Sequence, residues 1–308
     1  MTGPGGAGML SSVNWAWIFS ALSLALACER SELLGRVDDP VATGGAAGAG
    51  EGGSGPDPIG PLSDPDARDT DPTFTGDLTE LYYMSSRTGS KNIRVSKRDS
   101  AASDWGASAE VPELSTGYQE ENPRIAADGL RLWFFTDRDR DLGTIWETTR
   151  ATRADAWGEL VPVPGLSLGA GTSNVSAGMN ADATLAVLSA ARDGSGYDLY
   201  RFERASDAEA FGSPEPLTEL NSASDDFDPY LSPNGLAVAF ASNRRGGFDI
   251  FLARRTSLDV PFEAPVPLEL NSVDYEESAP NLSPDLAYLM YSSDRDGSLD
   301  IYEARLFP

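Results

Sequence analysis

Histidine is absent from this 308-residue chain, and cysteine occurs once, at Cys28. Without histidine there is no Ser-His-Asp or Cys-His nucleophile system, no His-ligated zinc and no imidazole to act as general base. A single cysteine can form no internal disulfide, so the folded part of the chain depends on packing alone. Carboxylate chemistry and the binding of hard cations remain open to this sequence.

Basic residues are also scarce. The chain has 23 Lys and Arg against 48 Asp and Glu, for a formal net charge of −25. Such an excess of negative charge repels nucleic-acid phosphates and anionic lipid surfaces, so we expect no nucleic-acid partner. Long apolar runs are missing too, because no stretch of about eighteen apolar residues occurs after residue 28.

The chain does contain an internal repeat. Its clearest copy is 228–251, DPYLSPNGLAVAFASNRRGGFDIF, and each of five colinear copies has a central arginine, 51 to 54 residues from the next. In this copy SPNG is a turn signal, an apolar strand follows, and a second turn precedes the strand that begins at Asp249. Four copies continue into an aromatic residue and a Pro-rich extended run. The central arginines are Arg87, Arg138, Arg192, Arg244 and Arg295.

Four short strands in each period of about fifty residues indicate the blade of a β-propeller. Neighbouring blades bury each other's apolar faces, and a closed ring protects the edge strands. The predicted fold class is all-β: a β-propeller of five four-stranded blades, preceded by a signal peptide and a disordered linker. A β-sandwich would also have short strands, but it does not predict a block that recurs five times without a gap.

The repeat block resembles the TolB-type propeller repeat of bacterial envelope proteins. The copies at 228–251 and 279–302 match that pattern best, with D-P or A-P at the start, L-S-P in the first turn and D-I-F or D-I-Y at the end. The copy at 176–200 lacks the proline and the turn glycine, and the copy at 71–94 lacks the final Asp. The resemblance implies the propeller fold strongly and a function only weakly.

The first 28 residues carry no charged side chain, and 15–27 form an apolar core of the length found in signal peptides. This core ends in Ala-Leu-Ala-Cys, which resembles a bacterial lipoprotein signal. The resemblance implies cleavage before Cys28 and lipidation of its thiol. The alternative is a conventional secretory leader with an incidental cysteine.

The sequence predicts three regions: a signal peptide at 1–27, a flexible tether rich in Gly, Ala, Pro and Asp at 28–54, and the propeller at 55–308. The fifth copy has no fourth strand of its own, because the sequence ends soon after 300–302. Residues 55–62 resemble the fourth-strand segment 264–268, so we expect them to close the ring. The expected repeat blocks are 71–120, 121–174, 175–226, 227–277 and 278–308.

Acidic residues gather before the first strand of several copies, where an antiparallel blade places one mouth of the central channel. They could be turn formers that cap backbone N–H groups, or a site for Ca²⁺ or a basic partner segment. They could also include two catalytic carboxylates of a glycoside hydrolase, about 5–9.5 Å apart with one pKa raised. The expected binding residues are Glu120, Glu121, Asp226, Asp228, Glu276 and Glu277.

These observations favour a non-enzymatic, lipid-anchored propeller of the bacterial cell envelope, facing the periplasm or the cell surface. It would bind a protein or an envelope polymer through the acidic loop face. The alternative function is a carboxylate-dependent glycoside hydrolase or a carbohydrate-binding five-bladed propeller. We expect a monomer with no catalytic residue, no cofactor unless Ca²⁺ binds at the acidic loops, and no contact with the membrane except through the lipid.

Overall fold

The computed structural model describes residues 58–138, 144–168, 173–191 and 196–306. Cys28, the predicted leader and the tether lie outside this part of the chain. The described residues form the strands β1 to β19 and no helix, and consequently none that is long and apolar enough to cross a membrane.

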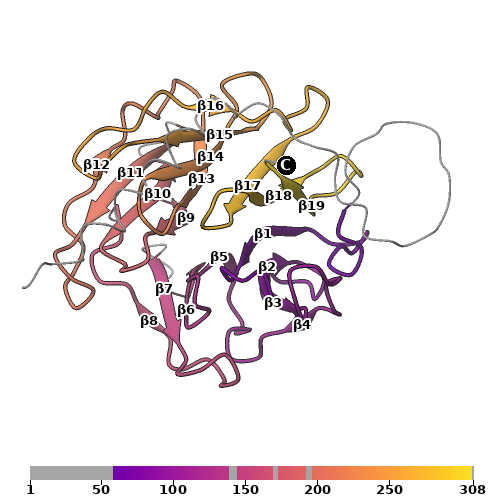
Figure 1. Ribbon diagram of the computed structural model, residues 1–308. Helices are drawn as coiled ribbons and strands as arrows, with labels where there is room; N and C mark the ends of the chain where they lie inside the picture. The colour runs from indigo at the N-terminus through magenta and orange to yellow at the C-terminus, as the bar shows by residue number, and fades with distance from the viewer. Residues whose placement is uncertain (1–57, 139–143, 169–172, 192–195, 307–308) are drawn as a thin grey trace, which may run out of the picture. The chain divides into compact units, whose positions relative to one another are not determined.

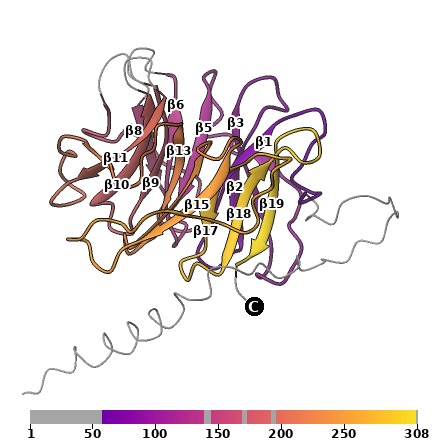
Figure 2. The ribbon, with the colours of Figure 1, turned by 90° about the horizontal axis from the view of Figure 1, so that it is seen from above.

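The strands form five antiparallel sheets arranged around a central axis, with β1, β5, β9, β13 and β17 innermost (Figure 1). Seen from above, the strands run roughly along this axis (Figure 2). The sheets are β1 Asp69–Phe74, β2 Glu80–Ser85, β3 Asn92–Lys97 and β4 Ala109–Glu110; β5 Glu120–Ile125, β6 Arg131–Thr136, β7 Thr144–Thr149 and β8 Val161–Pro162; β9 Ser173–Met179, β10 Leu185–Ala191, β11 Tyr197–Glu203 and β12 Glu215–Pro216; β13 Asp226–Leu231, β14 Ala237–Ser242, β15 Asp249–Arg254 and β16 Val266–Pro267; and β17 Glu277–Leu282, β18 Tyr288–Ser293 and β19 Asp300–Arg305.

The predicted five-bladed all-β propeller is therefore confirmed, and the inner strands begin one or two residues earlier than the expected repeat blocks. The Pro-rich runs form fourth strands of only two residues each, at the outer edges of the blades. Proline has no N–H to donate, so an outermost strand that pairs on one side tolerates it.

The core consists of layers of side chains between neighbouring blades. Tyr82 and Ile93 of the first blade pack with Phe134 and Trp157 of the second, and all four are buried. Corresponding layers lie between the second and third blades, the third and fourth, and the fifth and first. Each blade thus buries an apolar face that it could not bury alone.

The turn between the first and second strands contains one residue with φ between 55° and 76° in every blade. Glycine is at this position in two blades, and Leu or Ala is there in the others. The copy that lacks the turn glycine still makes the turn, with Ala183 in the left-handed region at φ 55°. The loss of the motif glycine in this copy therefore does not change the blade. The five residues are Leu78, Gly129, Ala183, Gly235 and Leu286.

A second arginine, which the sequence analysis missed, follows the third strand in four blades. Each guanidinium lies 4.1 to 4.4 Å from the centre of an aromatic ring of the same blade. Its Nε donates a hydrogen bond of 2.6 to 2.8 Å to the carbonyl of the left-handed turn residue. The arginine thus links the first turn to the loop that leads to the fourth strand. The pairs are Arg98–Trp105, Arg150–Trp157, Arg204–Phe211 and Arg255–Phe262.

The segment 58–62 occupies the place that follows the fourth strand in the other blades. Ile59 N donates to Ile301 O at 2.9 Å, and Leu62 N returns to Ile59 O at 2.8 Å. Equivalent pairs of hydrogen bonds follow β4, β8, β12 and β16. Of the predicted closing residues 55–62, the structure describes 58–62, and none of these is in a strand; 55–57 lie outside the described residues. Within the described residues the fifth sheet has three strands. The closing strand stays a prediction, and its C-terminal neighbours lie where it requires them.

We predict that Leu62→Ala destabilises the ring by about 2–5 kcal/mol, because Leu62 is fully buried between the first and fifth blades. Urea unfolding of the variant and of the unchanged protein measures the difference. Val266→Ala, at a half-exposed position on the edge of the fourth blade, is the control and should cost less than about 0.5 kcal/mol. Equal stability of the two variants would contradict ring closure by this segment.

Candidate functional site

The propeller has two different ends. We call the side that carries the connections between blades and the hairpins between second and third strands the loop face. The opposite side, with the turns between first and second strands, is the turn face. The inner strands run from the loop face to the turn face and line the central channel (Figure 1). The predicted acidic residues lie at the start of these strands, toward the loop face.

The inner strands bring equivalent residues into the channel at two levels. Nearer the loop face are Asp71, Asn122, Ser176, Asp228 and Ala279. All of these except Ser176 have a positive φ, between 48° and 59°, at an irregularity in the pairing with the second strand. Asp and Asn tolerate the left-handed region better than other non-glycine residues. The second level, toward the turn face, consists of Thr73, Arg124, Gly178, Tyr230 and Asn281.

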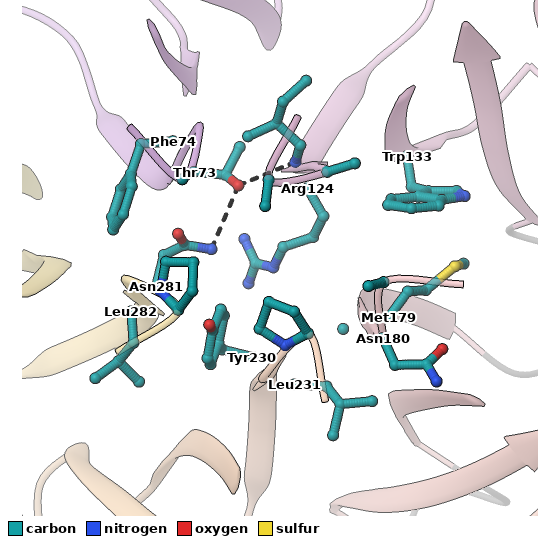
Figure 3. A pocket seen from close by; sticks show the side chains of 18 of the residues that line it. Thr73, Phe74, Arg124, Trp133, Met179, Asn180, Tyr230, Leu231, Asn281 and Leu282 are labelled. Atoms are coloured by element: carbon teal, nitrogen blue, oxygen red, sulfur yellow. Dashed lines mark hydrogen bonds between the residues drawn. The ribbon is translucent and has the colours of Figure 1, made fainter. Parts of the chain in front are cut away.

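Arg124 is the cation of the channel and is only 4% exposed. Its Nη1 donates to the Pro123 carbonyl at 3.0 Å and its Nη2 to Ser176 Oγ at 3.1 Å, while Nε is buried with no hydrogen-bond partner. Figure 3 shows the guanidinium pointing toward the centre, between Tyr230 and Asn281. Burial lowers the pKa of Arg124, and the nearby Asp228 and Asp71 oppose this shift.

Two buried carboxyl groups lie at the level above Arg124. Burial, reinforced by the nearby Asp71, raises the pKa of Asp228 to about 8, against the opposing effect of Arg124 and of the Ala279 N–H. Burial also raises the pKa of Asp71, whose carboxylate accepts the Thr70 hydroxyl at 2.9 Å. Asp228 is therefore mostly protonated at pH 7 and compensates little of the charge of Arg124.

A cavity of about 220 Å³ lies at the turn-face end of the channel. Its wall combines the second-level residues with apolar side chains such as Phe74, Trp133 and Leu282, several of which are labelled in Figure 3. Gly178 also lines it, and a Cβ there would come within 2.6 Å of the Leu231 backbone nitrogen. Glycine is therefore required for the close approach of β9 and β13.

Three of the six predicted binding residues are buried structural groups. Glu120, Asp226 and Glu277 are fully buried, and each faces the central arginine of its own blade. The carboxylates also accept hydrogen bonds from the preceding connection, as Asp226 does from Ser222 N at 2.6 Å. Asp69, which was not among the predicted residues, makes the same pair with Arg87 at 2.8 Å. The spacing of eighteen residues between acid and arginine was the signal in the sequence.

The other three predicted residues lie apart from one another. Glu121 forms an ion pair with Lys91 at 2.7 Å, Asp228 lies inside the channel, and Glu276 is exposed on the loop face. The six side chains therefore do not form one continuous acidic surface. Alternation along a strand explains this, because successive side chains at its start point to opposite sides. A role of these residues in binding stays a prediction.

The loop face exposes large apolar side chains that the sequence analysis did not single out. Val273 is 97% exposed, and Tyr118 and Tyr275 are also exposed, all three in connections between blades. Half-buried aromatic rings lie at the same end, where the ring centres of Phe227 and Phe248 are 4.7 Å apart. Exposed carboxylates of Asp274 and Glu276 flank Tyr275 in the chain.

Within the described residues, no group of three or more acidic side chains is arranged to hold a metal ion. The loops at 139–143 and 192–195, which contain Asp139, Asp141 and Asp193, lie outside this part. The carboxylates of the loop face that the structure does describe are largely engaged with arginines or backbone N–H groups. Asp294, for example, accepts the N–H of Glu276 at 2.9 Å.

No protein-family model and no curated protein matches this chain. Among solved structures it is similar to TolB from Acinetobacter baumannii, with 16% identity and a TM-score of 0.48, over 79% of this chain and 56% of that one. It thus spans little more than half the length of that protein. The TolB-like propeller indicated by the repeat is the fold that the structure has.

Two carbohydrate-active enzymes are also similar to it. One is a thermostable family-43 glycoside hydrolase, with 12% identity and a TM-score of 0.54, over 78% of this chain and 89% of that one. The other is an endo-arabinase from Bacteroides thetaiotaomicron VPI-5482, with 16% identity and a TM-score of 0.54, over 83% and 98%. At these identities the likeness shows a common fold and carries no activity with it.

We predict that Asp226→Asn lowers the free energy of unfolding by about 2–4 kcal/mol, because it removes the charge that faces Arg244 in a buried pair. The matched change Glu276→Gln, at an exposed acid of the same kind of connection, should cost less than about 0.5 kcal/mol. Chemical denaturation of both variants decides between a structural and a surface role. Equal losses of stability in the two variants would contradict the assignment of Asp226 as a buried structural group and of Glu276 as a surface group.

We predict that Asp228→Asn stabilises the protein more at pH 8 than at pH 5. The pKa of Asp228 is about 8 in the folded state, above its ordinary value of 3.8, so the folded state holds this proton more tightly. This tighter proton binding contributes fully to the stability of the folded state below about pH 4, and the contribution is lost as the pH rises toward 8.

Asparagine keeps the neutral form at all pH values, and Asn122 already occupies the equivalent left-handed position of the second blade. The difference in unfolding free energy between variant and unchanged protein should grow by more than about 1 kcal/mol between pH 5 and 8. A difference that is constant with pH would show that Asp228 ionises normally.

Proposed function

We propose that this chain is a non-enzymatic binding propeller of the bacterial cell envelope, anchored by lipid at Cys28, that holds a basic segment of a partner protein on its loop face. The observation that carries the proposal is the connection between the fourth and fifth blades, where the exposed side chains of Val273 and Tyr275 alternate with the exposed carboxylates of Asp274 and Glu276. Exposed apolar side chains rimmed by polar ones mark interaction sites.

The chemistry of the loop face favours a basic partner. Val273 and Tyr275 offer apolar area, and Asp274 and Glu276 offer negative charge next to them in the chain. Lysine and arginine side chains suit both, because their charged groups pair with carboxylates while their stems and guanidinium planes pack on aromatic rings. The net charge of −25 would steer such a partner toward the protein at low ionic strength.

The location follows from the leader. An apolar core that ends at a single cysteine supports export and lipidation, and the Gly-rich tether would separate the propeller from the membrane. A propeller anchored by lipid at its N-terminus would stay near the membrane and would reach other envelope proteins by diffusion along it. An envelope polymer is the other partner class that the sequence left open.

Glycoside hydrolysis is the second candidate, and the raised pKa of Asp228 beside Asp71 is the observation in its favour. Two features weigh against it. Both carboxyl groups are almost completely buried, and neither lines the cavity at the turn face. A catalytic pair needs room for the sugar and the water between or beside its carboxylates. Release of reducing ends from arabinan by the unchanged protein, abolished in Asp228→Asn, would favour this candidate over a binding role.

We predict that a photoreactive residue in place of Val273 forms a specific cross-link with one protein in intact envelopes. The same residue in place of Val266, which is half exposed but on the outer edge of the fourth blade, is the matched control and should form none. Mass spectrometry identifies the adduct. Affinity for the captured protein should fall at least threefold with Glu276→Gln and decrease with salt.

Two results would overturn the proposal. One is an absence of adducts at position 273 together with adducts at 266, which would move the interaction to the blade edge. The other is capture of a partner whose affinity is independent of both Glu276 and ionic strength, which would exclude recognition by charge.

A further inference from the structure

The cavity at the turn-face end of the channel is a separate site from the proposed loop face, and its chemistry is different. It is built around a cation, whereas the exposed charges of the loop face are mostly acidic. The question it raises is why a guanidinium group lies inside the molecule at all. Burying a charge is unfavourable unless a counter-charge and hydrogen bonds compensate it.

The described residues give Arg124 no carboxylate in direct contact, although Asp228 and Asp71 lie near enough to oppose the lowering of its pKa by burial. Its two hydrogen-bond acceptors, the Pro123 carbonyl and the Ser176 hydroxyl, are both neutral. None of the ion pairs within the described part of the chain includes Arg124, although the four central arginines that the structure describes each have a carboxylate within 4.0 Å. Arg124 is therefore a buried cation without a directly paired carboxylate, unlike these four arginines.

Arg124 keeps unused hydrogen-bonding capacity. Nη1 and Nη2 each use one N–H, for the Pro123 carbonyl and the Ser176 hydroxyl, so each keeps a second, whereas Nε has almost no accessible surface. Two N–H donors of one guanidinium can match the two oxygens of a carboxylate in a bidentate pair.

The cavity beside Arg124 limits the size and nature of what can bind. A volume of about 220 Å³ accommodates a molecule of roughly ten non-hydrogen atoms, less than a drug-sized ligand. Trp133, Leu231 and Leu282 give it an apolar wall, so the ligand needs a compact apolar body next to its charged group. Figure 3 shows these side chains arranged around the space that Arg124 enters.

We propose that the channel cavity binds a small organic carboxylate, a –COO⁻ group on a compact apolar body, through the guanidinium of Arg124. The same chemistry is offered by a free monocarboxylic acid and by the C-terminal carboxylate of a peptide with a large apolar last residue. The site is independent of the partner proposed for the loop face, so either proposal can fail alone.

The test uses calorimetry and ligand-observed NMR on the propeller with benzoate, butyrate and acetate as free acids, and Ala-Ala-Phe as the peptide. Benzamide and the peptide amide are the matched neutral controls. We expect at least one carboxylate to bind, and its neutral counterpart to bind at least tenfold more weakly. Binding of the free acids without the peptide assigns a small-molecule site, and preference for the peptide assigns a site for chain ends.

Arg124→Met should abolish binding while leaving the protein at least as stable as before, because it removes an under-compensated buried charge of similar volume. Arg150→Met is the contrasting variant: Arg150 has its carboxylate partner, Glu80, at 2.5 Å, so this change should lower the melting temperature. Arg124→Lys retains the charge without the paired donors and should weaken binding about tenfold. This variant keeps the test decisive if Arg124→Met fails to fold.

The pH dependence adds a readout that general destabilisation would not produce. Asp71 of β1, Glu121 and Arg124 of β5 and the Ala279 N–H of β17 surround Asp228. Above about pH 8 Asp228 ionises and becomes a competing counter-charge, so carboxylate affinity should fall at least threefold between pH 7 and 9. Asp228→Asn should remove that fall. The proposal is overturned if no carboxylate of the panel binds, or if Arg124→Met and the unchanged protein bind equally.

Discussion

The buried pair between an acid at the start of the inner strand and the central arginine of the same blade, seen in four of the five blades within the described residues, is the interaction on which this propeller depends. The arginine of the first blade also donates to the Leu62 carbonyl, and that of the fourth blade to the Leu220 carbonyl, both at 2.6 Å. One guanidinium thus joins the inner strand, the second strand and the incoming connection from the preceding blade. A buried carboxylate left without its arginine costs free energy. Partial opening of a blade junction that breaks the pair is therefore unfavourable.

This pairing also determines where part of the negative charge of the chain lies. Asp69, Glu120, Asp226 and Glu277 are buried and paired with arginines of their own blades. Because each acid is matched by one arginine, these pairs leave the formal net charge of −25 unchanged. The acids outside these pairs therefore carry the net charge that a partner meets.

The fold could be predicted from the sequence because its signals are local and repeated. Turn residues, an apolar second strand and a Pro-rich fourth strand recur at one spacing, and repetition averages out copies such as 176–200 in which single signals are lost. The closing role of 55–62 could be suggested for the same reason, by likeness to 264–268.

The site could not be predicted in the same way. Whether Glu120 or Glu121 is buried depends on which side of the strand each faces. This cannot be inferred from residue type or spacing unless the register of the strand pairing is known. Arg124 occurs in one copy only, at a position where the others have Thr, Gly, Tyr and Asn, so a search for repetition passes over it. The exposed Tyr118, Val273 and Tyr275 lie in connections of unequal sequence, where no pattern marks them.

The ring closure through Ile59 and Leu62 has a mechanical consequence. The first described residues of the chain, next to the long N-terminal region, are also those that join the last blade to the first. Tension applied from the N-terminal end would therefore act first on the junction that closes the circle. Because this junction is short, its backbone hydrogen bonds would break one after another under such a force. The ring would therefore open first at the junction nearest the end from which the protein is pulled.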